Sequence, residues 1–271
     1  MDGKLTVSII RGYQKKGGKC LSETRLQENI EMYLSVVNEI RDSINVIQGK
    51  RYIENHKKTL LFSVIDMLSK GVYGNRLGNN RTTMFEKFIL EFCAWENAQR
   101  ISLQQLVHLL DKTEEGKFSR LKDFAKTELY QYPDSQPVPF SYDPTYKRLK
   151  ELMPKGETTI LGVELKSLSH VSLLWKLRNS LVHEARSKGG TKLFDDDVQP
   201  HYVHYSTFGT DDEGNLIVTK ETWEMYHPVG FFNKMIDIAL TNVRTYLEAH
   251  SINPYDNYDF DPLWVEVRRN D

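Results

Sequence analysis

The stretch IEMYLSVVNEIRDSINVI, residues 30–47, decides the fold of this 271-residue chain. Its apolar side chains recur at alternating intervals of three and four residues, at Ile30, Tyr33, Val37, Ile40, Ile44 and Ile47. This spacing places them along one narrow face of an α-helix. Gly49 follows the pattern and predicts the end of that helix. A helix with one apolar face needs other elements to cover it, which favours a helical fold.

Helical periodicity returns along the rest of the chain. It predicts helices near residues 55–70, 83–99, 164–186 and 228–250, and Pro228 suits the first turn of the last one. A further start is marked after Ser102, where Ser102 and Gln105 fit a capping box and Ile101 with Leu106 fits a hydrophobic staple. Several amphipathic helices in succession are typical of a bundle.

The period changes beyond residue 200. HYVHYSTF and NLIVTKE are rich in aromatic and β-branched residues, and GTDDEGN lies between them. Strand-forming runs on either side of turn residues predict an antiparallel hairpin at about residues 201–220. The segment ELYQYPDSQPVPFSYDP, residues 128–144, has four prolines and indicates an extended surface connection.

Together these patterns predict a mainly α fold, an up-and-down helical bundle with one inserted antiparallel β-hairpin. Three parts are expected along the chain. Residues 1–25 form an N-terminal arm, residues 26–250 a helical domain, and residues 251–271 a C-terminal tail.

Composition narrows the class of protein. The formal net charge is -1, so the chain lacks the global basic field of a protein that coats nucleic acid. No run of eighteen apolar residues predicts a membrane helix. The two cysteines, Cys20 and Cys93, cannot build a disulfide framework or a four-cysteine zinc site. We therefore expect a cytoplasmic protein with no membrane partner, no metal and no cofactor.

An arginine stands inside the apolar face of one predicted helix, in LWKLRNSLVHEAR, residues 174–186. At about 100° per residue, the apolar side chains within roughly 60° of Arg178 are Val171, Leu174, Leu181, Val182 and Ala185. A guanidinium buried alone there would be costly, so it requires a partner or a cleft. Asn179 lies one turn before His183, where it is expected to orient the imidazole.

Two readings of Arg178 remain open. In the first it is a structural strut that pairs with a carboxylate such as Asp66 or Glu86 on a neighbouring helix. In the second it works with His183 in a site. The same Arg-to-His spacing recurs at Arg51 and His56 among polar flanks, which we interpret as a chance match.

RNSLVH, residues 178–183, resembles the signature of the HEPN superfamily, whose members are helical bundles. The resemblance implies that Arg178, Asn179 and His183 are active-site residues of a metal-independent endoribonuclease. It also implies a homodimer in which two motifs face each other, and a bacterial stress or antiviral setting with a protein regulator or antitoxin. We expect the basic residues of the same helix, Lys176 and Arg186, to contact RNA.

The chemistry of these residue types suits RNA cleavage. A histidine near neutral pKa can move a proton, and an arginine fork can bind the phosphate as its charge grows. The expected product is a 2',3'-cyclic phosphate. The alternative is a non-catalytic HEPN-like module that binds a protein partner. His170, on the same helix, is expected to be a polar flank.

Overall fold

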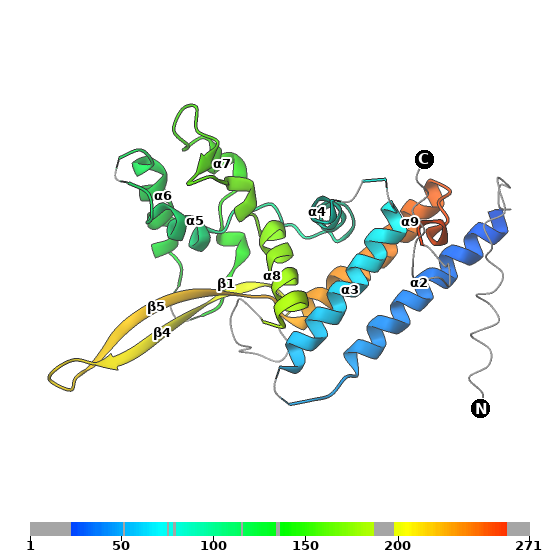
Figure 1. Cartoon of the computed structure of the whole chain (residues 1–271), viewed down its shortest axis with the longest axis horizontal. Helices are drawn as coiled ribbons and strands as arrows, with labels where there is room; N and C mark the ends of the chain where they lie inside the picture. Colours follow the sequence, from blue (N-terminus) through cyan, green and yellow to red (C-terminus); the bar gives the residue numbers. More distant parts are fainter. Residues whose placement is uncertain are drawn as a thin grey trace, which may run out of the picture.

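The computed structural model describes residues 23–50, 52–74, 76–77, 80–114, 116–133, 136–186 and 198–258. The expected arm, except for its last residues, and most of the expected tail lie outside these ranges. The described chain is mainly helical, with a small antiparallel sheet (Figure 1). Its helices are α2 (Glu23–Asn45), α3 (Ile53–Tyr73), α4 (Arg81–Phe92), α5 (Leu103–Leu110), α6 (Ser119–Tyr130), α7 (Tyr146–Lys150), α8 (His170–Glu184) and α9 (Val229–Ala249).

Each predicted helical segment contains a helix, but two ends were wrong. α4 stops at Phe92 instead of near residue 99, because Ala94 adopts a φ of 46°, which interrupts helical backbone. α8 begins at His170 instead of residue 164, with Ser169 as its N-cap. The preceding residues form a short hairpin, β2 (Thr159–Ile160) and β3 (Val163–Glu164), and the 3-10 helix η2 (Leu165–Leu168).

A first hydrophobic cluster lies among α2, α3, α4, α8 and α9. The heptad face of α2 is mostly buried in it, since Ile30, Tyr33, Val37 and Ile44 are at most 5% exposed. Ile40 departs from the pattern and is 37% exposed. Asn29 and Leu34, which are outside the heptad, are buried as well, so the packed face of α2 differs in part from the one that the heptad predicts.

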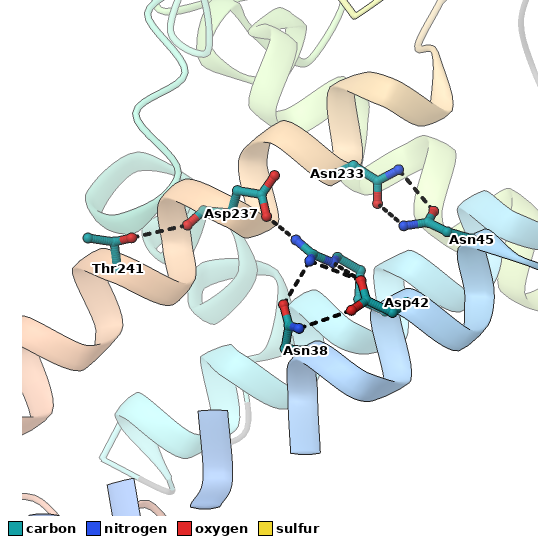
Figure 2. Close-up of polar contacts among 7 residues, drawn as sticks. Asn38, Asp42, Asn45, Asn233, Asp237 and Thr241 are labelled. Carbon is teal, nitrogen blue, oxygen red and sulfur yellow. Dashed lines mark hydrogen bonds and ion pairs between the residues drawn. The ribbon is translucent and has the colours of Figure 1, made fainter. Parts of the chain in front are cut away.

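A polar seam holds α2 against α9 (Figure 2). The Arg41 guanidinium donates to the carboxylate of Asp237 on α9 and to Asp42 on its own helix. One turn further, the amides of Asn45 and Asn233 exchange hydrogen bonds of 3.1 and 3.0 Å. Paired amides and a charge pair have fixed positions along each helix, so the seam sets the register between the two helices.

A second hydrophobic cluster contains α5, α6 and the sheet. Strand order is β1–β4–β5, where β1 is Val138–Pro139, β4 is His201–Thr210 and β5 is Leu216–Tyr226. The predicted hairpin is confirmed, and it extends to Tyr226. Ser102 caps α5 as predicted, accepting from the Gln105 amide at 3.3 Å. The other half of the predicted capping box does not form, because the Ser102 amide donates to the Leu168 carbonyl at 3.0 Å.

The interpretation of residues 128–144 as a surface connection is right only in part, for exposed residues such as Tyr130 and Tyr142. Val138, Phe140 and Asp143 are fully buried. The prolines hold an extended backbone, and this lets β1 pair with Tyr202 and His201 of β4. Pairing directs Val138 and Phe140 into the second cluster, so the proline-rich segment is part of the core.

A buried carboxylate joins α8 to the second cluster. Asp143 Oδ1 accepts from the Tyr132 hydroxyl at 2.6 Å and the Leu103 amide at 2.9 Å. Asp143 Oδ2 accepts from the Tyr202 hydroxyl at 2.5 Å and contacts His170 Nε2 at 2.7 Å. We call these five residues the Asp143 network. Four partners satisfy one carboxylate, as burial requires.

His170 is therefore not a polar flank of its helix. Its side chain is fully buried, and its ring stacks on Phe140 with centroids 3.9 Å apart. The expectation failed because the helix face on which His170 lies is covered by the proline-rich segment. That segment itself was expected at the surface.

Candidate functional site around Arg178

α8 carries the RNSLVH motif and packs on α3 and α4. Ser169 accepts from the Ser172 amide and starts the helix. Val171, Leu174 and Leu181 are buried, as the stripe predicts, whereas Val182 is 38% exposed and Ala185 is exposed. Arg178 thus lies at the edge of the buried stripe, beside α3.

Three groups hold the Arg178 guanidinium. Its Nη2 donates to Asp66 Oδ2 on α3 at 2.8 Å, and its Nη1 donates to Asn179 Oδ1 at 3.2 Å. Its Cζ lies 5.0 Å from the centre of the Trp175 ring. The arginine side chain is 12% exposed, so these contacts compensate for most of its lost hydration.

One nitrogen of this guanidinium stays without a partner among the described residues. Arg178 Nε is buried and makes no hydrogen bond there. Asp66, by contrast, is 38% exposed and open to water. The guanidinium is fixed in place, but its capacity to donate hydrogen bonds is not used up.

Asp66 is one of the two strut partners that the sequence suggested. The other, Glu86 on α4, accepts from the Ser172 hydroxyl at 2.7 Å instead. Trp175 was not singled out from the sequence. Its position three residues before Arg178 is the signal that would have found it, because side chains three apart on a helix are neighbours.

His183 is not brought to Arg178. It is exposed near the end of α8, and within the described chain it has no hydrogen-bond partner. The Asn179 amide oxygen contacts Arg178. The expected contact between Asn179 and His183 is therefore not among the hydrogen bonds of the described residues. Within one chain the motif gives an arginine–asparagine pair and a separate imidazole.

The two predicted RNA contacts, Lys176 and Arg186, are exposed. Lys176 Nζ donates to the Ser167 carbonyl at 3.1 Å. At the helix end Ala185 has a φ of 50°, and the Arg186 carbonyl accepts from the Ser180 hydroxyl at 2.6 Å. Lys176 lies on α8 before Arg178, and Arg186 lies two residues after the helix ends.

The described ranges contain neither a cluster of metal ligands nor a membrane-spanning helix. They hold no group of three or more His, Cys, Asp or Glu side chains arranged for a metal ion. No helix in them is long and apolar enough to cross a membrane. Arg51, from the second Arg-to-His match, lies outside the described residues.

Comparison with known proteins identifies no relative. The chain matches no protein-family model, no curated protein and no solved structure.

Proposed function

We propose that this chain is a metal-independent endoribonuclease of HEPN type, acting in the cytoplasm and built on an up-and-down bundle. The observation that carries the proposal is how the side chains of the motif are arranged on α8. Arg178 is held in a fixed position beside Asn179, and His183 of the same helix is exposed to solvent. A fixed guanidinium and a free imidazole are the two groups that cleavage of an RNA phosphodiester uses.

The proposed reaction uses the nucleophile within RNA. A histidine takes the proton of the 2'-hydroxyl, and the 2'-oxygen attacks the adjacent phosphorus. The bond from phosphorus to the 5'-oxygen breaks, and a second proton-transfer group, acting as the acid, protonates that oxygen. The products are a 2',3'-cyclic phosphate and a 5'-hydroxyl. Arg178 stabilises the added charge on the phosphate oxygens.

A homodimer would supply both proton-transfer groups. One chain offers a single His183, and its exposed position on α8 leaves it open to a second molecule. Two facing motifs provide one imidazole as base and one as acid. A protein regulator or antitoxin that covers α8 would hold such an enzyme inactive, as in the stress and antiviral systems that the HEPN resemblance implies.

The second candidate is a non-catalytic helical module that binds a protein partner. The ion pair between Arg178 and Asp66 favours it, because a carboxylate on the guanidinium competes with a phosphate. In this reading Arg178 is the strut between α8 and α3.

Incubation of the pure protein with mixed RNA in EDTA separates the two candidates. We expect cleavage by wild-type protein, with 2',3'-cyclic ends, and at least about a hundredfold loss in His183→Ala. His56→Ala is the matched control, since His56 is also exposed on a helix and belongs to the chance match. Equal rates in wild type and His183→Ala, or no cleavage by wild type, would exclude the ribonuclease and favour the binding module.

A further inference from the structure

A row of exposed cations lies on the helices that pack on the second cluster and continues onto α8. α6 and α7 are in the upper left of Figure 1, and η2 contacts both α7 and α8. We call this surface the basic track. Its cations come from four elements, in the order α6, α7, η2 and α8: Arg120, Lys147, Arg148, Lys150, Lys166 and Lys176.

Two contacts between a cation and an aromatic ring join neighbouring elements of the track. The Cζ of Arg148 on α7 lies 5.3 Å from the centre of the Phe124 ring on α6. The Nζ of Lys166 on η2 lies 5.5 Å from the centre of the Tyr146 ring on α7. Both rings are partly exposed, and both cations are exposed. The rings therefore hold the two cations in position at the surface, where their charge stays available to a ligand.

The cations of the track are not neutralised by carboxylates. None of the five on α6, α7 and η2 forms an ion pair with another described residue. On the other side of α6, by contrast, Lys122 and Lys126 both pair with Asp111. The same elements, with Glu151 and Glu164 at their ends, hold seven basic and four acidic residues, so the surface has a local excess of positive charge in a chain of net charge -1.

The track leads to the exposed histidine of the motif. Lys176 Nζ donates to the Ser167 carbonyl at 3.1 Å, which keeps this lysine beside Lys166. His183 lies seven residues after Lys176 on α8, so the two share one face of the helix and are about 10 Å apart along its axis. Both are exposed. An extended ligand that lies over α7 and η2 can therefore reach His183 by following α8.

We propose that the basic track binds the phosphate backbone of single-stranded RNA. Unpaired cations in a row attract a polyanion and release its counterions. Rings placed between the cations favour a single strand over a duplex, because the bases of a single strand are free to stack on aromatic rings and guanidinium planes. That the bound strand is the substrate of His183 rests on the proposed function, whereas binding itself requires no cleavage.

Fluorescence anisotropy with a 2'-O-methyl RNA oligonucleotide of about 12 nucleotides tests the track, because the methyl group blocks the nucleophile and prevents cleavage. Replacing Arg148 and Lys166 together by glutamine should raise the dissociation constant at least about fivefold. The slope of log K against log salt should become shallower by about 1.4, since two phosphate contacts are lost.

The matched control is the double replacement of Lys70 and Lys87 by glutamine. These lysines lie 5.0 and 5.3 Å from the centres of the Tyr258 and Tyr73 rings, on the first cluster. The control removes the same charge and the same kind of contact, and it should change binding less than about twofold. Equal losses in the two double variants would overturn the proposal, since binding would then follow total charge.

A second double variant guards against disturbed packing. The side chains of Lys147 and Lys150 contact no ring among the described residues, and their replacement by glutamine should weaken binding in the same direction. Near-ultraviolet circular dichroism should show native packing in every variant.

Two further results would overturn the proposal. One is the absence of binding by wild type at roughly 100 µM protein. The other is tighter binding of a polyglutamate peptide than of RNA, with the same loss in the variant of Arg148 and Lys166, which would assign the track to an acidic protein. His183→Ala should bind the oligonucleotide as wild type does. If wild type binds RNA through the track but cleaves none, the ribonuclease is excluded and the binding surface is supported.

Discussion

Arg178 on α8 and Asp66 on α3 form an ion pair of 2.8 Å that ties together two helices 112 residues apart in sequence. The arginine is nearly buried, and the aspartate is more than one-third exposed. Burying the charge of Arg178 therefore costs free energy, whereas water can still solvate the charge of Asp66. Removing either residue should have unequal consequences.

A double-mutant cycle measures this pair. Asp66→Ala should lower the free energy of unfolding by about 1–3 kcal/mol, because it leaves the Arg178 charge buried without its carboxylate. Arg178→Met should cost less, since the aspartate left behind is solvated. The coupling energy in urea unfolding should be about 1 kcal/mol. The exposed pair of Lys87 and Glu91 is the control, with coupling below about 0.5 kcal/mol.

A second prediction concerns the loss of stability when the carboxylate of the Asp143 network is replaced by an amide. Asp143→Asn should cost about 2–4 kcal/mol, because an amide group cannot accept from donors on both sides. Asp111→Asn should cost less than about 1 kcal/mol, since Asp111 accepts from Lys122 and Lys126 at the surface. Guanidinium unfolding followed by near-ultraviolet circular dichroism compares them. Similar losses in both variants would contradict the proposed importance of the Asp143 network.

Acid pH should destabilise the protein through His227. Burial lowers the pKa of His227 well below its ordinary value of 6.5, and the nearby His170, Lys58 and His201 lower it further. The unfolded chain therefore binds a proton below pH 6.5 that the folded chain does not. The contribution of neutral, buried His227 to the free energy of unfolding is therefore fully present above that pH. It is lost as the pH falls, by up to about 2 kcal/mol at pH 5.

Urea unfolding of wild type and His227→Gln between about pH 7 and 5 tests this linkage. The glutamine variant should start from a lower stability and show a shallower decline. Parallel slopes for the two proteins would assign the acid sensitivity to other groups.

Gly71, inside α3, should resist replacement by alanine. Helix propensity alone predicts a gain of up to ~1 kcal/mol. A Cβ there would lie 2.3 Å from the Tyr33 hydroxyl, which donates to the Met67 carbonyl at 2.7 Å. We expect a net loss of about 1–3 kcal/mol in thermal or urea unfolding. Ser63→Ala, on the exposed surface of α3, should instead give a gain of about 0.5 kcal/mol.

The helices could be predicted from the sequence because their signals are local. The heptad at residues 30–47, the Ser102 cap and Pro228 act within a turn or two, and the structure has helices at each. The start of α8 could not be predicted from the sequence, because the periodicity of residues 164–186 does not reveal that residues 159–164 pair as strands. Tertiary pairing overrode the local pattern there.

The candidate site was predicted in part. The apolar neighbours of Arg178 required a partner, and Asp66 was among the carboxylates considered. The sequence could not place His183, because its periodicity does not show that this imidazole is exposed at the end of α8 and away from Arg178. The Asp143 network was missed for a similar reason. Tyr132, His170 and Tyr202 approach one carboxylate from distant segments, and no local spacing links them.

The Asp143 network also has a consequence for the order of folding. Tyr202 lies 59 residues after Asp143, so the carboxylate cannot receive its last hydrogen bond until β4 has left the ribosome. Until then, the Asp143 carboxylate lacks one of its hydrogen-bond partners. We therefore expect the second cluster to fold slowly and late during synthesis. Nascent chains truncated near residue 200 should therefore remain protease-sensitive, whereas chains that include the whole hairpin should become resistant.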